Sequence, residues 1–196
     1  MEYWLPLLLF VVISTLTPGP NNLLLAASGL NFGLRPTLPH VLGIHLGVYG
    51  LVILCGLGLG QILLTVPGVE TALKLFATAY LAYLAWQMLG LSVVETQATA
   101  RPMRIWEASL FQVSNPKAWM MAITGLNLAL AADHSVPVAV AVLCCCFATL
   151  GTLCNLSWVA AGASLQAQFQ DARKRRLINA TLAAITVATI AAFWVQ

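Results

Sequence analysis

Long apolar stretches separated by short polar connectors make up almost the whole chain. A helix needs about 20 apolar residues to cross the hydrocarbon core of a membrane. Six stretches meet this requirement, and we expect membrane-spanning helices at Leu5–Gly29, Thr37–Leu64, Thr71–Leu91, Ile105–Ala131, Val136–Leu165 and Leu177–Val195. The predicted connectors are Asn31–Pro36, Thr65–Glu70, Ser92–Arg104, Ala132–Ser135 and Gln166–Arg176. The stretches lack the alternation of apolar and polar positions that marks a membrane strand, so an all-α membrane protein is predicted.

The amino-acid composition supports an integral membrane protein. Hydrophobic residues make up 60% of the 196 positions and charged residues only 8%, whereas a soluble domain carries about 25% charged residues. The basic residues lie in short connectors and form no stripe with aromatic residues, which argues against a nucleic-acid partner. The first apolar stretch is too long for a signal peptide and has no basic segment before it, so we expect it to remain in the mature protein.

Basic residues are distributed unequally between the two sets of connectors. The second and fourth connectors offer only Lys74, just inside the third stretch, whereas the first, third and fifth contain seven basic residues. These seven are Arg35, Arg101, Arg104, Arg173, Lys174, Arg175 and Arg176. Because basic loops stay on the cytoplasmic side, the odd connectors are predicted to be cytoplasmic and both termini to lie outside.

The six predicted spans divide into two groups of three on either side of the third connector. Three is an odd number, so the second group must run inverted relative to the first. We therefore expect a single transmembrane transporter domain over residues 1–196, built from two inverted three-helix repeats at about 1–95 and 105–196.

Two helix-breaking segments interrupt the first and fourth stretches at similar depth. Thr-Pro-Gly-Pro-Asn-Asn occupies 17–22 and Ser-Asn-Pro-Lys occupies 114–117. Proline lacks an N–H group and frees carbonyls of the preceding turn, which at membrane depth must face protein or a watery cavity. Paired breaks in two inverted repeats indicate a transporter substrate site, although a proline can also be a simple kink. The predicted binding residues are Thr17, Pro18, Gly19, Pro20, Asn21, Asn22, Asn115, Pro116 and Lys117.

Polar residues near the middle of the apolar stretches add further candidates. Lys117 lies roughly 18 Å into its helix, where an ionisable group usually marks a binding site or pathway; the alternative is that it reaches back to the cytoplasmic interface. His45 could relay protons or serve a structural role, and Asn155 could contact the substrate or bond another helix. His40 and His134 fall at connector edges, where we expect them to be solvated.

Cysteines and glycines favour packing roles over chemistry. The five cysteines lie in apolar stretches without Cys-x-x-Cys spacing, and no metal or cofactor site is predicted. Gly43-x-x-x-Gly47 and Gly56-x-x-x-Gly60 predict close helix contacts, within one chain or between subunits.

Several motifs together resemble those of the LysE-type amino-acid exporters. They are Thr-Pro-Gly-Pro-Asn-Asn, Gly33-x-Arg35, Leu-Gly-Ile-His-Leu-Gly at 42–47, Asn-Pro-Lys-Ala at 115–118 and Leu-Gly-Thr-Leu-Cys-Asn at 150–155. The likeness runs from Thr15 to about Gly162, and the double asparagine and the Asn155 segment look most like the cysteine/O-acetylserine exporter branch. The resemblance implies a six-helix inner-membrane exporter, driven by proton exchange and often oligomeric, in which both breaks shape the substrate path. His45 departs from the small or aliphatic residues usual in that segment.

The charges inside the membrane favour a neutral or thiol amino acid as substrate. Lys117 and the N-terminal ends of the broken helices could hold a carboxylate, while freed carbonyls and asparagine oxygens could accept from an ammonium. All acidic residues lie at helix ends or in connectors: Glu2, Glu70, Glu95, Glu107, Asp133 and Asp171. A strongly cationic substrate would therefore lack a partner, and proton coupling would lack a carboxylate carrier.

Three other functional classes are weighed against the exporter. An enzyme would need a nucleophile and base inside the bilayer, and Ser28 with His45 is a poor pair. A thiol-redox carrier would need cysteines near the two breaks, where there are none. A passive channel or facilitator for small zwitterions fits the same residues and stays open.

Overall fold

The computed structural model describes residues 4–60, 65–66, 68–90, 101–131, 135–168 and 172–195. Every regular element in this part of the chain is a helix, which confirms the all-α prediction. The helices are α1 (Trp4–Leu16), α2 (Pro20–Phe32), α3 (Leu34–Gly56), α5 (Val69–Gly90), α6 (Ile105–Ser114), α7 (Pro116–Leu130), α8 (Val136–Cys146), the π-helix η2 (Phe147–Gly151), α9 (Thr152–Gln168) and α10 (Ala172–Val195).

Both predicted breaks are present. Between α1 and α2, Gly19 takes an extended conformation (φ −173°, ψ 177°) and Pro20 begins the next helix, so the two segments are bent by 55°. Between α6 and α7 the single residue Asn115 is extended (φ −93°, ψ 104°) and Pro116 begins α7. A proline suits the first position of a helix because the N–H it lacks would have no partner there.

Three predicted boundaries are wrong. Instead of a connector over Asn31–Pro36, the single residue Gly33 joins α2 to α3, with φ of 84°, a value that few residues other than glycine adopt. Pro36 lies in the first turn of α3, where a missing N–H is tolerated. The predicted last connector, Gln166–Arg176, is likewise mostly helical, because α9 continues to Gln168 and α10 begins at Ala172.

The second span also ends earlier than expected, and some predictions fall outside the described residues. Helix α3 ends at Gly56, whereas the prediction ran to Leu64, of which 61–64 are not described. The end of the third predicted span at Leu91, most of the third connector (92–100) and the 132–134 segment with His134 are also outside the described residues. The π-helix inside the predicted fifth span was not foreseen, because its sequence, Phe-Ala-Thr-Leu-Gly, fits an ordinary apolar helix.

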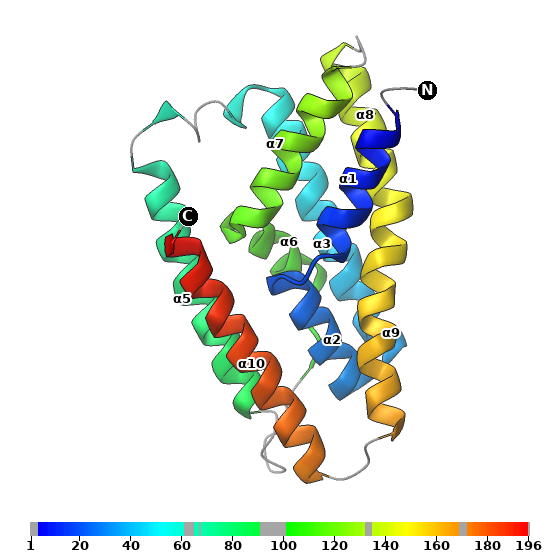
Figure 1. Cartoon of the computed structure of the whole chain (residues 1–196), viewed down its shortest axis with the longest axis vertical. Helices are drawn as coiled ribbons and strands as arrows, with labels where there is room; N and C mark the ends of the chain where they lie inside the picture. The colour runs from blue at the N-terminus through cyan, green and yellow to red at the C-terminus, as the bar shows by residue number, and fades with distance from the viewer. Residues whose placement is uncertain are drawn as a thin grey trace.

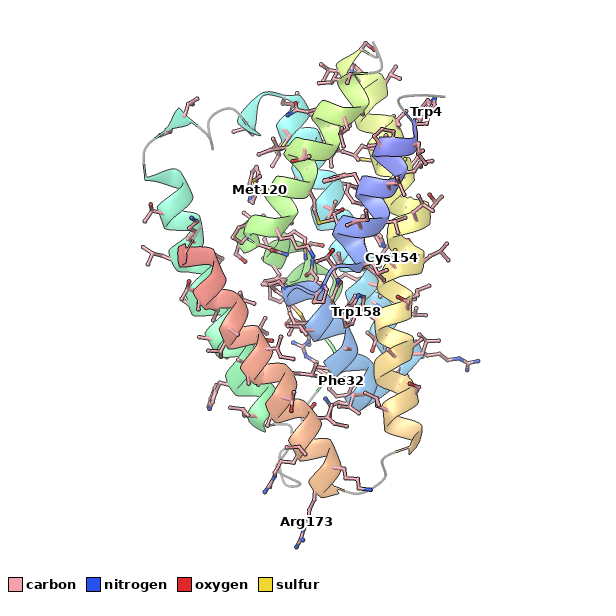
Figure 2. All side chains as sticks on the ribbon, viewed as in Figure 1. Trp4, Phe32, Met120, Cys154, Trp158 and Arg173 are labelled. Atoms are coloured by element: carbon pink, nitrogen blue, oxygen red, sulfur yellow. The ribbon has the colours of Figure 1, made fainter. Side chains whose placement is uncertain are left out.

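The helices form an elongated bundle in which α1 and α2 lie end to end (Figure 1). Helix α2 packs against α9, α3 against α6, and α5 against α10. Trp4 lies at one end of the bundle and Arg173 at the other (Figure 2). The pair α5 and α10 joins the rest through an apolar cluster formed by Leu24, Ala27, Leu81, Leu84, Ala85, Phe111 and Ala183.

Four glycines allow the closest helix contacts. A Cβ atom on Gly29 would lie 2.2 Å from the Val159 carbonyl oxygen, and one on Gly162 would lie 2.0 Å from that of Ala26, so α2 and α9 touch backbone to backbone. Gly43 and Gly47 contact α6 in the same way. The Gly43-x-x-x-Gly47 motif therefore packs within one chain, which answers the question of whether it serves a contact between subunits.

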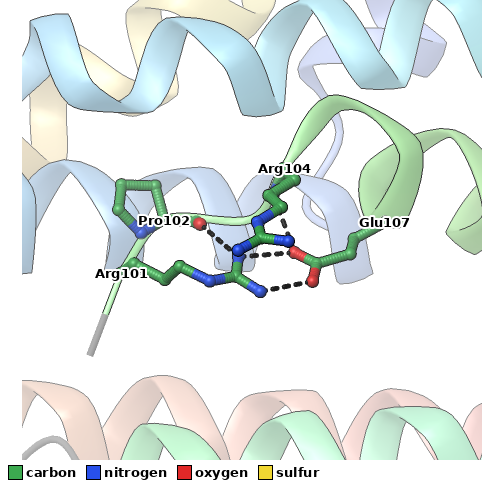
Figure 3. A network of polar contacts seen from close by, with 4 residues as sticks. All are labelled: Arg101, Pro102, Arg104 and Glu107. Atoms are coloured by element: carbon green, nitrogen blue, oxygen red, sulfur yellow. Dashed lines mark hydrogen bonds and ion pairs between the residues drawn. The ribbon is translucent and has the colours of Figure 1, made fainter. Parts of the chain in front are cut away.

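A salt bridge and hydrogen bonds fix the start of α6 (Figure 3). The Arg101 guanidinium donates to both carboxylate oxygens of Glu107, at 2.8 and 2.5 Å. The same carboxylate accepts from the backbone N–H of Arg104 at 2.8 Å, which caps the first turn. Glu107 thus neutralises a cation at the helix end and takes no part in the interior of the bundle.

The outer surface is apolar, as a lipid-facing surface must be. Large hydrophobic side chains such as Leu5, Ile13, Leu57 and Leu153 are more than half exposed. Among the described residues, α3 and the helical run Val136–Leu165 are each long and apolar enough to cross a membrane, and the bent α1–α2 pair would make a third span. The chain is therefore a helical membrane protein.

Candidate functional site

A cavity of about 450 Å³, its opening included, lies where the two helix breaks meet. Its walls come from the end of α1, the starts of α2 and α7, the middle of α3, and η2 with α9. The lining residues are Ser14, Thr15, Gly19, Asn21, Asn22, Ile44, His45, Val48, Asn115, Lys117, Ala118, Met121, Phe147, Gly151 and Asn155.

The cavity brings together residues of both predicted breaks and both additional candidates. Gly19, Asn21, Asn22, Asn115, Lys117, His45 and Asn155 all line it. Thr17, Pro18, Pro20 and Pro116 do not line it, although the backbone of Thr17 contributes a hydrogen-bond acceptor to it. The prolines instead create the breaks by ending one helix and starting the next.

Lys117 links the two breaks directly. Its Nζ donates a hydrogen bond of 2.7 Å to the Thr17 carbonyl oxygen. The side chain passes beside Gly19, where an added Cβ would lie 3.1 Å from Nζ. Lys117 therefore points across the cavity toward α1 and α2 in this structure and does not reach back to the interface.

Asn22 closes the first break. Its Nδ2 donates to the carbonyl oxygens of Thr15 (2.7 Å) and Thr17 (2.8 Å), two of the groups that the break frees. The Leu16 carbonyl, which lacks its usual donor because residue 20 is a proline, accepts from the Trp158 indole at 3.2 Å. Buried polar groups need such partners in an apolar surrounding. Asn22 and Trp158 thus stabilise the broken backbone itself.

The second break is closed in a similar way. The Asn115 side chain accepts from the Lys117 backbone N–H at 3.1 Å, and the Trp119 indole donates to the Val113 carbonyl at 2.8 Å. Each break therefore has one asparagine and one tryptophan that pair with the backbone. Neither tryptophan was a sequence candidate, because tryptophan is common in membrane proteins and the sequence gives no sign of the contact.

Asn21 pairs with Gln112, a residue that the sequence analysis missed. Asn21 Nδ2 donates to Gln112 Oε1 at 2.8 Å, and Gln112 Nε2 donates back to Asn21 Oδ1 at 3.1 Å. Gln112 is fully buried and also donates to the Ala108 carbonyl. This double hydrogen bond connects α2 to α6 at the floor of the cavity. A glutamine one turn before the Asn-Pro-Lys segment was the available signal.

Several polar groups at the cavity have unused bonding capacity. The backbone N–H groups of Asn21 and Asn22, in the first turn of α2, make no hydrogen bond to any described residue. The Asn155 side chain, 3% exposed, also makes none within the described part of the chain. Helix N-terminal N–H groups favour a negative charge. The cavity thus offers donors for a carboxylate, together with the ammonium of Lys117.

The prediction that His40 is solvated is wrong. It is 1% exposed, and neither ring nitrogen has a hydrogen-bond partner in the described structure. The physical reason is that α3 starts earlier than predicted, which places His40 in the second turn of a packed helix. No three His, Cys, Asp or Glu side chains among the described residues are arranged to hold a metal ion.

The five cysteines lie outside the cavity lining. We expect a variant with all five replaced by alanine or serine to retain most of its transport, because none of them lines the cavity. Transport of a radiolabelled amino acid in proteoliposomes, per molecule of inserted protein, measures this. Complete loss of transport with normal insertion would instead favour a thiol-redox carrier.

Comparison with known proteins places the chain among membrane translocators. A family model described as LysE type translocator matches residues 12–195. The cysteine/O-acetylserine efflux proteins of Escherichia coli and Shigella sonnei are each 30% identical over 182 residues, which is 91% of this chain and 90% of the relative. No solved structure is significantly similar to the chain.

Proposed function

Because the chain belongs to the family of LysE type translocators, we propose that it exports a small zwitterionic amino acid or amino-acid derivative from the bacterial cytoplasm. The relatives at 30% identity are named for cysteine and O-acetylserine, and this supports a neutral or thiol amino acid as substrate. The observation that carries the proposal is the Lys117–Thr17 contact, which joins the two breaks at a cavity lined by residues of both.

The hydrogen bonds at the cavity suggest how a zwitterion binds. The Thr17 carbonyl already accepts from both Asn22 and Lys117, and a carbonyl oxygen has two lone pairs. A substrate ammonium can reach this oxygen only by replacing the Lys117 ammonium. The released Lys117 can then pair with the substrate carboxylate, together with the N–H groups of Asn21 and Asn22. The exchange leaves the net charge of the cavity unchanged. It favours binding of a ligand that carries both an ammonium and a carboxylate.

Alternating access is supported by the unequal packing of the two halves of the bundle. On the side of the cavity toward Gly33, where α2 ends and α3 begins, the helices pack backbone to backbone. The glycines at these contacts are Gly29, Gly43, Gly47 and Gly162. Toward the outer end of α3 the closest approach is to a side chain instead: a Cβ on Gly56 would lie 2.7 Å from Val140 Cγ2, and one on Gly50 would meet no atom within 4 Å. A passive channel needs a continuous path, so a tightly packed half favours a transporter closed toward the cytoplasm. We propose that protons drive the reopening.

The six-span inverted repeat belongs to the same proposal. Under it, α2 corresponds to α7 and α3 to the α8–α9 run, so contacts should occur in matched pairs. The contact of α2 with α9 is matched by that of α3 with α7, and the contact of α10 with α2 by that of α5 with α7. Helices α5 and α10 correspond to each other and pack together (Figure 1). These matched contacts support two repeats related by an axis in the membrane plane.

The proposed orientation places both termini outside and the start of α10 in the cytoplasm. Lys174 is then expected to be protected from the outside of intact cells, because the seven basic residues favour the cytoplasmic side. A single cysteine at position 174, on the background without the five native cysteines, should not react with an impermeant thiol reagent until the membrane is permeabilised. Efficient labelling of intact cells would contradict the orientation and the inverted repeat with it.

Efflux from proteoliposomes tests the proposed function. Purified protein should release radiolabelled L-cysteine, under reducing conditions, or another small neutral amino acid, faster than empty vesicles do. L-lysine should be transported poorly because the cavity lining contains no acidic side chain. An absence of flux for every small zwitterion tested would contradict the proposal.

A further inference from the structure

His45 occupies a position in the cavity that the substrate exchange at Lys117 does not use. It lies in the middle of α3, is 7% exposed, and lines the cavity beside the π-helix. Its Nε2 lies 3.0 Å from the Thr152 hydroxyl oxygen, the first residue of α9. One ring nitrogen is thus held by a neighbouring helix, while the ring itself faces the cavity.

The Thr152 hydroxyl fixes which nitrogen of His45 carries the hydrogen. Thr152 Oγ1 lies 2.7 Å from the Ala148 carbonyl and donates its single hydrogen there. The hydroxyl oxygen can then only accept from His45, so Nε2 bears the hydrogen. The other nitrogen, Nδ1, keeps its lone pair and makes no hydrogen bond to a described residue. This arrangement leaves a basic nitrogen on a ring that lines the cavity.

The π-helix creates this contact. The run from α8 to α9 widens at Phe147–Gly151, directly before Thr152, and both Phe147 and Gly151 line the cavity. A Cβ on Gly151 would lie 3.6 Å from His45 Cε1, so the small residue leaves the ring in ordinary contact distance. Local π-helical turns often occur at functional sites because they redirect the side chains that follow.

The charged and titratable groups around His45 leave it as the proton acceptor in the cavity. Lys117 on α7 is the cation across the cavity, and it is bound to Thr17. On its own helix the ring of Tyr49 lies 5.9 Å away, and the acid on α6, Glu107, is paired with Arg101 at the start of that helix. The remaining titratable side chains on the helices packed against α3 are thiols of α8 and α9, at Cys144, Cys145, Cys146 and Cys154.

We propose that His45 is the proton-binding residue that couples export to inward proton movement. The inference rests on the proposed export function. A proton from hydronium outside bonds to Nδ1 and adds a second positive charge to the cavity, which repels the substrate ammonium and the displaced Lys117. Substrate then leaves to the outside, and after the cavity reopens inward the Nδ1–H bond breaks and the proton enters the cytoplasm. One proton enters for each zwitterion exported, and histidine changes charge in the physiological pH range.

Two transport modes in proteoliposomes separate proton coupling from substrate binding. One mode is net transport of radiolabelled L-cysteine driven by a pH gradient. The other is exchange of labelled for unlabelled L-cysteine at equal pH on both sides, which requires binding and reorientation but no net proton movement. His45→Gln should lose the pH-driven component by about tenfold and keep exchange within about twofold of wild type. His45→Asn serves as a second variant if glutamine lowers the yield.

The matched control is Thr152→Ser, which keeps the hydroxyl and should keep both modes. Loss of exchange as well as pH-driven transport in both His45 variants would overturn the proposal, because His45 would then bind substrate or hold the fold. Unchanged pH-driven transport in either variant would also overturn it. If the wild-type protein exchanges L-cysteine but its net transport does not respond to the pH gradient, the role of His45 is contradicted and the export function is not. Wild-type protein that transports no amino acid contradicts the export function itself.

Discussion

Lys117→Met is expected to abolish substrate export while the protein still reaches the membrane at normal or higher levels. The variant loses the hydrogen bond to Thr17 and the one lysine or arginine among the described residues that line the cavity. A charge-assisted hydrogen bond lost in the bound state costs up to about 3 kcal/mol, which corresponds to roughly a hundredfold in affinity. Insertion should not suffer, because a charge at the bilayer centre costs on the order of 3 kcal/mol.

The measurement for Lys117→Met is flux divided by the amount of inserted protein. Met120→Leu is a matched control on the same helix, since Met120 is 55% exposed on the outer surface and does not line the cavity. The control should transport like wild type. If Lys117→Met kept its flux per molecule, the lysine would be a structural residue and the exchange with the substrate ammonium would be wrong.

Gly29→Ala and Gly162→Ala are expected to prevent stable folding. Each new methyl group would lie 2.0–2.2 Å from a backbone carbonyl oxygen of the opposing helix, so α2 and α9 would have to separate. Even ordinary overpacking costs about 1–3 kcal/mol, and backbone atoms cannot move aside as a flexible side chain can. Gly50→Ala is the matched control because its methyl group meets no atom within 4 Å.

Abundance in the membrane and thermal stability of the detergent-purified protein measure this effect. The Gly50 variant should match wild type, whereas the Gly29 and Gly162 variants should give little folded protein or a much lower melting temperature. Equal stability of all three variants would mean that α2 and α9 are not in backbone contact, and the closed half of the bundle would have to be described differently.

The sequence revealed the two breaks because their cause is local. Proline removes a hydrogen-bond donor from its own position, so Pro18 disfavours continuation of α1, while Pro20 and Pro116 are suited to begin the helices that follow the breaks. The asparagines beside them could also be recognised as partners for the freed carbonyls. The sequence could not show which partner each asparagine has. Asn22 and Asn115 form hydrogen bonds with the backbone, whereas Asn21 forms them with the Gln112 side chain.

The contacts that close the site were beyond sequence reasoning because their partners are distant along the chain. Trp158 donates to Leu16, 142 positions away, and Thr152 bonds His45 across 107 positions. The π-helix arises inside a uniformly apolar run without proline or a polar residue to mark it. The connector at Gly33 was overestimated because Pro36 suggested a loop, although a proline is equally at home in the first turn of a helix.

Hydrogen bonds within the protein satisfy several of the carbonyls that the two breaks free. The carbonyls of Thr15, Leu16, Thr17 and Val113 all accept a hydrogen bond from the protein. Of these donors, only Lys117 at Thr17 can leave without exposing a carbonyl, since Asn22 still bonds the same oxygen. Lys117 is therefore the donor that the substrate replaces.

Equilibrium binding of three related ligands tests this central claim most directly. L-cysteine carries both charged groups, cysteamine lacks the carboxylate, and mercaptopropionate lacks the ammonium. Titration calorimetry on the purified protein under reducing conditions should show L-cysteine binding at least about tenfold more tightly than either analogue, because only the zwitterion can replace Lys117 at Thr17 and also pair with it. In Lys117→Met the preference for L-cysteine over cysteamine should disappear. Cysteamine or mercaptopropionate binding as tightly as L-cysteine to the wild-type protein would contradict the account.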